Sequence, residues 1–268
     1  MIIPANKTPW MEAWFHGYAR RYLQRSFHTV YKLGEAIPAV QDERLPLLVC
    51  LNHSSWWDVL LAFYAGREWL PGDNYGVMDA DQLERYKIFT RLGMIGVDRA
   101  SLAGIREFLN YTETLLKGRQ RALWLTPQGE LTSNHARPIR FQPGLGNLAA
   151  RLGDFNITTI ALHYEFWKER QPEAFISFSP LRRINAAGPG FNRKSFVTEQ
   201  EQHLETQLTD LLALVELRNP SVFQPVLRGK SGISPTYDTL RSLGARLRGR
   251  RFDAEHGSVV TPPWKERR

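Results

Sequence analysis

Cysteine and long apolar runs are what this sequence has least of. Its 268 residues include one cysteine, Cys50, so no disulfide can form within the chain and the sequence fits a reducing compartment. No apolar run approaches the roughly 18 residues that a membrane-spanning helix requires. The N-terminus also lacks the basic segment and apolar stretch of a signal peptide. We therefore expect a cytoplasmic protein that does not cross a membrane.

Acidic residues are fewer than basic ones. Lysine and arginine number 35 against 27 aspartate and glutamate residues, and the sequence pI is about 9.7. This balance indicates an anionic partner, such as nucleic acid, a membrane surface or a phosphorylated substrate, and does not choose among them. The hydrophobic content of 43% is typical of a globular protein with a buried core.

Apolar segments of strand length alternate with helical patterns through the middle of the chain. The expected strands are 45–51, 94–97, 122–126, 157–164 and 175–178, and the expected helices are 59–64, 79–91, 101–117, 145–152 and 199–218. This alternation predicts an α/β fold, a single domain with a mostly parallel or mixed central sheet flanked by helices. Thr198 lies three residues before Glu201, in the capping-box spacing, and marks the expected start of the last helix.

The N-terminal residues predict an amphipathic helix over 9–33. Aromatic residues recur at every fourth position of this segment, at Trp10, Trp14, Tyr18 and Tyr22. The basic residues among them are Arg20, Arg21, Arg25 and Lys32. Such a face fits either packing on the core or an interfacial position on a membrane, where rings and arginines meet the lipid headgroups.

The C-terminal residues 220–268 differ in composition from the rest of the chain. They are rich in proline, glycine and arginine and show little apolar periodicity. They fit either a solvated surface segment or a contact with anionic lipid. The sequence thus divides into an N-terminal amphipathic helix at 1–33, for which both a core-packed and a membrane-interfacial position stay open, a folded domain at 34–219, and a basic extension at 220–268.

A polar turn follows the expected strand at 45–51 and contains His53 and, five residues later, Asp58. In a straight helix five residues rotate through ~500°, which leaves two side chains about 140° apart, so a contact requires His53 to precede the helix. The carboxylate would then fix the tautomer of the imidazole. The other ring nitrogen would be free to take a proton from a hydroxyl.

Other chemistries stay open on the residues alone. Ser54 or Ser55 could act as a nucleophile beside His53, although the Gly-x-Ser-x-Gly elbow is absent. Cys50 could also be a nucleophile, although a lone cysteine in an apolar run is more often part of the core. A metal site would use residues whose spacings match no ligand motif, namely His53, Asp58, His135 and His163.

Three segments resemble the glycerol-phosphate and lysophosphatidate acyltransferase superfamily. The first reads Asn52-His53-Ser54-Ser55-Trp56-Trp57-Asp58 and is similar to the block in which Asn-His is followed by four residues and Asp. The second reads Gly93-Met94-Ile95-Gly96-Val97-Asp98-Arg99 and is similar to the family's Gly-x-x-x-x-Asp-Arg element. The resemblance extends from about residue 30 to 215.

The third segment, residues 125–133, departs from the family pattern Phe-Pro-Glu-Gly-Thr-Arg-Ser. It keeps the Pro-x-Gly frame and the trailing serine, but Gln128 stands in place of the glutamate and Leu131 in place of the arginine. Either Arg137 or Arg140 supplies the missing charge from a neighbouring position, or the acceptor carries no phosphate there.

The resemblance implies transfer of a fatty acyl group from acyl-CoA or acyl carrier protein to a hydroxyl of a lipid acceptor, in the first instance a lysophosphatidate-like glycerolipid. It implies no metal or redox cofactor. By the same resemblance His53 is the general base, Asp58 orients it, and Arg99 pairs with the acceptor phosphate. The further residues expected to bind substrate are Asn52, Gly129, Arg137 and Arg140, and the candidates for the wall of an acyl groove are Trp56 and Trp57.

The expected partners are therefore the lipid acceptor, the thioester donor and a membrane surface, which the N-terminal helix and basic residues would contact peripherally. The alternatives are an acyltransferase for a glycosylated or isoprenoid lipid, a hydrolase that uses water, and a non-catalytic lipid-binding protein. A nucleic-acid-binding protein also fits the charge, but the basic residues concentrate at the two ends and no helix-turn-helix, zinc or RNA-recognition signature is present. We therefore expect no nucleic-acid partner.

Overall fold

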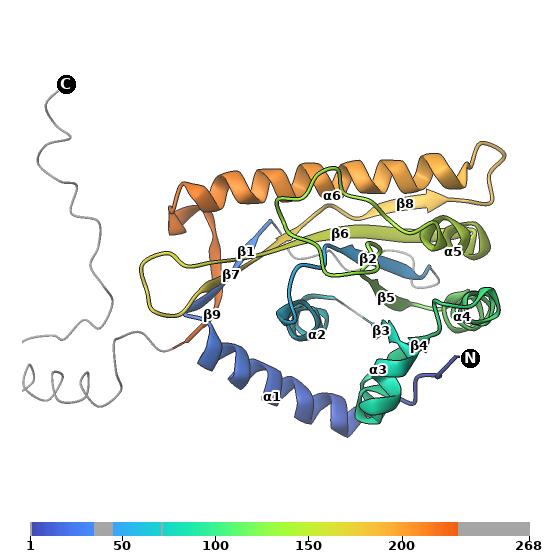
Figure 1. Ribbon diagram of the computed structural model, residues 1–268, viewed down its shortest axis with the longest axis horizontal. Helices are drawn as coiled ribbons and strands as arrows, with labels where there is room; N and C mark the ends of the chain where they lie inside the picture. The colour runs from blue at the N-terminus through green and yellow to red at the C-terminus, as the bar shows by residue number, and fades with distance from the viewer. Residues whose placement is uncertain (1, 35–44, 71, 230–268) are drawn as a thin grey trace, which may run out of the picture.

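A nine-stranded mixed sheet forms the centre of the protein (Figure 1). The computed structural model describes residues 2–34, 45–70 and 72–229. The strand order is β4-β3-β5-β2-β6-β7-β1-β9, with β8 paired to β6 outside this path. The strands are β1 (Thr29–Leu33), β2 (Leu47–Leu51), β3 (Asp73–Asp79), β4 (Met94–Val97), β5 (Arg121–Leu125), β6 (Asp154–Glu165), β7 (Glu173–Phe178), β8 (Arg182–Asn185) and β9 (Gln224–Arg228).

Helices cover both faces of the sheet. They are α1 (Pro9–Ser26), α2 (Trp57–Trp69), α3 (Ala80–Arg85), α4 (Leu102–Leu116), α5 (Gly144–Leu152) and α6 (Arg193–Glu216), with short 3-10 turns at Lys87–Leu92 and Pro220–Val222. One apolar core joins the sheet to α4, α5 and α6, and a second joins it to α1 and α2. In Figure 1, α6 runs along the opposite side of the sheet from α1 and α2. The predicted α/β fold with a mixed sheet is confirmed.

The centre of the sheet positions the functional turn. β2 lies between β5 and β6 and is parallel to both, and all five of its residues are buried. A strand that is buried on both faces reads as a continuous apolar run, which is why its sequence predicted it well. Polar residues follow at its carboxyl end, and in open α/β sheets that edge is where ligands bind.

The N-terminal helix is shorter than predicted. The pattern over 9–33 indicated one helix, but α1 ends at Ser26 and residues 29–33 form β1. β1 pairs in parallel with β7 and antiparallel with β9, so hydrogen bonds to distant strands decide its conformation. Lys32 is buried in this strand with its ammonium 5.9 Å from the centre of the Trp69 ring, so it does not join the exposed arginines of α1.

Other boundaries also moved. α6 begins at Arg193, because the side chain of Asn192 accepts a hydrogen bond from the backbone N–H of Ser195; Thr198 lies inside the helix. The helix expected at 79–91 is split into α3 and a 3-10 turn. The sequence pattern missed β1, β3, β8 and β9, and the 220–268 extension contributes β9 to the sheet. Its arginine-rich part, from residue 230 onward, lies outside the described residues.

Candidate active site

The turn between β2 and α2 brings His53 onto Asp58. The histidine precedes the helix and the aspartate lies in its first turn, and Nδ1 of His53 is 2.9 Å from Oδ2 of Asp58. The same carboxylate oxygen accepts the backbone N–H groups of Ser54 at 2.7 Å and Ser55 at 2.8 Å. The Asp58 side chain is fully buried, whereas 21% of the His53 side chain is exposed. The predicted contact is therefore present, and it leaves one edge of the imidazole open to solvent.

A tyrosine from β6 completes the surroundings of Asp58. The hydroxyl of Tyr164 donates to Oδ1 of Asp58 at 2.7 Å. Burial of the phenol, and then the neighbouring Asp58 carboxylate, raise the pKa of Tyr164 well above its ordinary value, so the hydroxyl keeps its proton and donates. No sequence signal pointed to Tyr164, because it lies 106 residues from Asp58 along the chain.

These contacts decide which ring nitrogen of His53 can act as a base. Four donors converge on the Asp58 carboxylate, namely the two serine N–H groups, the tyrosine hydroxyl and Nδ1–H of His53. A carboxylate surrounded in this way is an acceptor, so the shared proton belongs to Nδ1. Nε2 of His53 makes no hydrogen bond within the described residues, and it is the nitrogen that can accept a proton from a ligand.

The divergent third segment holds the backbone of His53. Oε1 of Gln128, in the loop after β5, accepts the His53 N–H at 2.8 Å, and the Thr132 N–H donates to the His53 carbonyl at 2.7 Å. A glutamine can make the first bond as well as a glutamate, because only an acceptor oxygen is needed. The loop therefore still bonds to the backbone of His53. It carries one negative charge fewer there than the family pattern, which has a glutamate at this position.

Asn52 is used inside the protein. Its side chain is 1% exposed, accepts the Leu162 N–H at 2.7 Å, and donates to the Leu162 carbonyl at 2.9 Å and to Oδ1 of Asn134 at 2.7 Å. These bonds tie the end of β2 to β6 and to the third-segment loop. Within the described residues the Asn52 amide therefore bonds to the protein itself, and its contact with substrate stays a prediction.

Arg99 and Gly129 meet at the rim of the site. Arg99 donates two hydrogen bonds to the Asp79 carboxylate, from Nε to Oδ1 at 2.5 Å and from Nη2 to Oδ2 at 2.7 Å. Its Nη1 donates to the Gly129 carbonyl. Gly129 has a φ of +82°, and a Cβ there would lie 2.9 Å from Nη1 of Arg99. The positive φ favours glycine at this position, and a side chain there would also displace the end of the Arg99 side chain. The Arg99 side chain is 46% exposed, so its remaining N–H groups face solvent and can meet an anion.

The other two arginines contact α6. Arg137 donates to the carbonyls of Asn134 and Ala136, at 2.8 and 2.9 Å, and to Oγ1 of Thr209 at 3.2 Å. Arg140 has a side chain that is 73% exposed and lies 3.5 Å from Oε2 of Glu201. These contacts hold residues 134–140, which follow the third segment, against α6. They do not bring either guanidinium to Arg99 or His53.

The tryptophan pair connects the turn between β2 and α2 to α1. Trp57 is half-buried, with ring centres 4.9 Å from Phe27 and 5.3 Å from Tyr22. Trp56 is 65% exposed and lies edge-on to Tyr22 at 6.4 Å. Trp56 and Trp57, which lie three and four residues after His53, therefore both contact the aromatic side of α1.

The alternative nucleophiles find no support in the geometry. Cys50 is fully buried in β2, and burial raises the pKa of its thiol to about 12, so no thiolate is available. Oγ of Ser55 accepts the Trp57 N–H at 3.3 Å, and Oγ of Ser54 is buried without a partner in the described residues, so neither hydroxyl is bonded to His53.

The alternative metal cluster is likewise not assembled. His163 shares a hydrogen bond of 3.1 Å with Asn134 and lies near His135, with ring centres 6.3 Å apart, but neither ring pairs with His53. In the part of the chain that the structure describes, no three histidine, cysteine, aspartate or glutamate side chains group as metal ligands.

The fold and the site define an α/β protein in which a histidine is hydrogen-bonded to a buried aspartate at the carboxyl edge of the sheet. Residues 29–163, about half of the chain, match the family described as Acyltransferase. The chain belongs to the acyltransferase family, as the resemblance of its motifs predicted, and it is an acyltransferase.

The crystal structure of the 1-acyl-sn-glycerophosphate (LPA) acyltransferase PlsC from Thermotoga maritima has a similar fold. The TM-score is 0.51 and the sequence identity is 16%, over 76% of this chain and 79% of that chain. No curated protein sequence matches this one. Among the described helices, none has the length and apolar character needed to cross a membrane.

Proposed function

We propose that the protein transfers a fatty acyl group from a thioester donor to a hydroxyl of a lipid acceptor, in the first instance a lysophosphatidate-like glycerolipid. The observation that carries this proposal is the bond between Nδ1 of His53 and Asp58, which leaves Nε2 without a hydrogen bond in the described part of the chain, on a side chain that is 21% exposed. Nε2 takes the proton of the acceptor hydroxyl as its oxygen attacks the thioester carbonyl. The carbon–sulfur bond then breaks, and the thiolate recovers the proton from the imidazolium.

Asp58 would lower the cost of the charge that forms on His53. The imidazolium appears 2.9 Å from a carboxylate whose position is set by two backbone N–H groups and Tyr164. An opposite charge at this distance stabilises the protonated ring, and the fixed geometry requires no reorganisation during the reaction. This chemistry needs no metal or redox cofactor.

Arg99 is the residue best placed to bind a phosphate on the acceptor. It lies against the third-segment loop that holds His53 and keeps part of its guanidinium exposed. One observation favours a second candidate, an acceptor without phosphate such as a glycosylated or isoprenoid lipid. Asp79 already neutralises Arg99, and both Arg137 and Arg140 contact α6 instead of the site.

An assay with matched acceptors tests the function. We expect purified protein with acyl-CoA and lysophosphatidate in vesicles to form the diacyl product, because Arg99 retains N–H groups for the phosphate. Monoacylglycerol is the control, since it keeps the free hydroxyl of lysophosphatidate and carries a second hydroxyl in place of the phosphate; mass spectrometry measures both products. Faster acylation of monoacylglycerol would identify the second candidate. Free fatty acid alone would identify a hydrolase, and no turnover of any acceptor would contradict the proposal.

We also propose that the protein lies on a membrane through an aromatic ridge, defined as Trp10, Trp14, Tyr18, Tyr22 and Trp56. Neighbouring rings along it are 5.9 Å apart for Trp14 and Tyr18, 5.7 Å for Tyr18 and Tyr22, and 6.4 Å for Tyr22 and Trp56. Trp10, Trp14 and Trp56 are 62%, 58% and 65% exposed. Large exposed rings in a contiguous row are typical of an interaction surface, and indole suits the headgroup region.

The ridge ends at the turn between β2 and α2, where His53 lies. This position supports a role for the ridge in supplying lipid substrate to His53. Arg20, Arg21 and Arg25 of α1 are exposed and would add attraction to anionic headgroups. A lipid acceptor could then reach His53 from the membrane surface without passing through water.

Removal of two indoles from the ridge is expected to weaken membrane binding. The double substitution Trp10→Ser and Trp14→Ser should lower partitioning to anionic vesicles about tenfold or more, because each ring loses apolar area that the interface would bury. Co-sedimentation with phosphatidylglycerol vesicles measures this. Leu217→Ser is the matched control, since Leu217 is 68% exposed at the end of α6 on the other side of the sheet. Equal binding of both variants would contradict a role for the ridge.

A further inference from the structure

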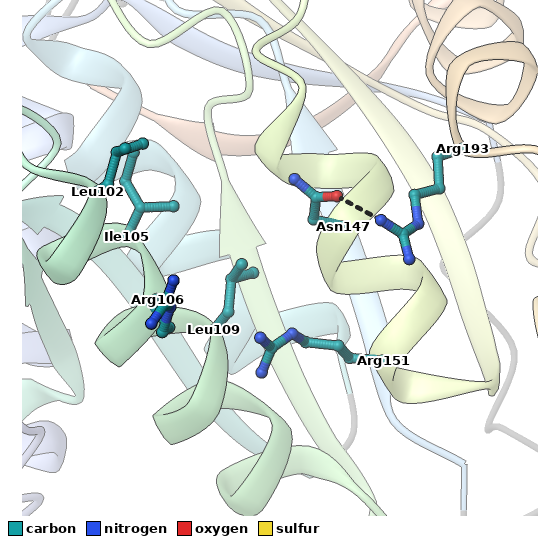
Figure 2. A pocket seen from close by; sticks show the side chains of 7 residues that line it. All are labelled: Leu102, Ile105, Arg106, Leu109, Asn147, Arg151 and Arg193. Carbon is teal, nitrogen blue, oxygen red and sulfur yellow. Dashed lines mark hydrogen bonds between the residues drawn. The ribbon is translucent and has the colours of Figure 1, made fainter.

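A concave site lies between α4 and α5, and His53 is not among the residues that line it. Figure 2 shows this cavity, which has a volume of about 330 Å³. The residues that line it are Leu102, Ile105, Arg106 and Leu109 from α4, Asn147 and Arg151 from α5, and Arg193 from the first turn of α6. Its size is that of a small-molecule site.

The lining contains three arginines and no acidic residue. Arg193 donates to Oδ1 of Asn147 at 3.1 Å, and Arg151 donates to Asn110 and lies 3.5 Å from Oε2 of Glu113. Arg106 is exposed and makes no hydrogen bond or ion pair within the described residues. A concave surface lined by one sign of charge concentrates its field, and guanidinium groups are well suited to phosphate oxygens.

The cavity also has an apolar side. Leu109 is buried at its base, and Leu102 is 85% exposed at its rim. An exposed leucine beside unpaired arginine fits a ligand with both phosphate and apolar parts, and it is poorly suited to a free inorganic ion.

Both helices that form the cavity start at the active-site loops. Arg99 lies three residues before the start of α4, and Nε2 of Gln142, two residues before α5, donates to the carbonyl of Gln128 at 3.3 Å. From Gly144 to Arg151 the chain advances seven residues, which is about 10 Å of helix. Arg151 therefore lies about two helical turns along α5 from the loop that contacts His53, whereas Arg106 lies four residues into α4 and Arg193 contacts Asn147, three residues into α5.

This separation bears on which substrate the cavity can hold. A glycerol phosphate whose hydroxyl reaches Nε2 of His53 has its phosphate only a few bonds away, close to Arg99. An acyl-pantetheine thioester has a long flexible arm between its reacting carbonyl and its phosphates. Only the donor can place a phosphate so far from the reacting atoms.

We propose that the cavity between α4 and α5 binds the phosphates of coenzyme A in the acyl donor. The proposal rests on the proposed function, and it assigns Arg106, Arg151 and Arg193 to the donor and Arg99 to the acceptor. A carrier protein would present a broad acidic surface, whereas this site is a small concave pocket. We therefore assign it to the nucleotide end of coenzyme A.

Binding of adenosine 3′,5′-bisphosphate and coenzyme A to the full-length protein tests the assignment, with pantetheine as the phosphate-free probe. We expect the wild type to bind the two phosphate compounds and not pantetheine in isothermal titration calorimetry. Arg106→Gln should raise both Kd values about tenfold, and addition of Arg193→Gln should raise them further. Arg119→Gln is the matched control, because Arg119 is exposed just after the other end of α4. Unchanged Kd values in the two pocket variants would overturn the proposal.

Kinetics separate this proposal from the function on which it rests. We expect Arg106→Gln to raise KM for acyl-CoA with kcat and the acceptor KM unchanged. If the acceptor KM rises instead, or if acyl carrier protein competes for the cavity while adenosine bisphosphate does not, the assignment to coenzyme A is overturned. Phosphate-dependent binding without acyl transfer would retain the cavity and reject the function. Acyl transfer that is insensitive to both variants would retain the function and reject the cavity.

Discussion

Substitution of His53 by alanine is expected to lower kcat for acyl transfer by about 10²–10⁴-fold, the usual contribution of a positioned general base. The decrease is expected in kcat and not in KM. In the proposed mechanism the imidazole acts by removing a proton during attack, and only 21% of its side chain is exposed for contact with substrate. Steady-state kinetics with acyl-CoA and the preferred acceptor measure it. Vesicle binding should stay at the wild-type level, since the aromatic ridge is intact.

The matched control for this variant is His203→Ala. His203 is an exposed histidine of α6, and its Nε2 lies 3.4 Å from Oε1 of Glu199. It is remote in sequence from His53 and Asp58. Its removal should leave kcat within about twofold of wild type, as is usual for a surface substitution. Wild-type kcat in the His53 variant would rule out His53 as the base. The contact between His53 and Asp58 would then have a structural role only.

Asp58→Asn is expected to be the second most damaging change, with a loss in kcat of about 10²–10⁴-fold by analogy with other histidine–carboxylate pairs. The amide has nearly the same shape, but it offers one acceptor oxygen and turns a donor toward groups that are themselves donors. If the amide N–H faces Nδ1 of His53, the ring holds its proton on Nε2 and can no longer act as a base.

The same variant should also unfold more easily, by about 1–3 kcal/mol, because at least one buried donor loses its acceptor. Tyr164→Phe is the matched control, since it removes one of the four bonds to Asp58 and leaves the carboxylate. Urea denaturation measures stability and steady-state assays measure kcat for both. An equal loss of stability with an equally small loss of kcat in the two variants would show that Asp58 acts only in folding.

The sequence alone was sufficient for the contact between His53 and Asp58. Both residues lie within six positions, and a strand that ends before a helix leaves few ways to arrange them. β2, β4 and β5 were also predictable, because continuous apolar runs mark strands buried on both faces. β3 and β9 were missed, since their residues are polar or contain proline and their conformation depends on neighbouring strands.

Only the tertiary structure decided which distant residues complete the site. The order of β5, β2 and β6 brings Gln128 to the backbone of His53, Leu162 to Asn52 and Tyr164 to Asp58. The packing of α4, α5 and α6 likewise gathers the three arginines of the cavity between α4 and α5. Local patterns reflect periodicity over a few turns, so they were enough to predict that His53 and Asp58 meet. Contacts across a hundred residues depend on strand order and helix packing, which is why the bond from Tyr164 to Asp58 and the grouping of Arg106, Arg151 and Arg193 emerged only from the fold.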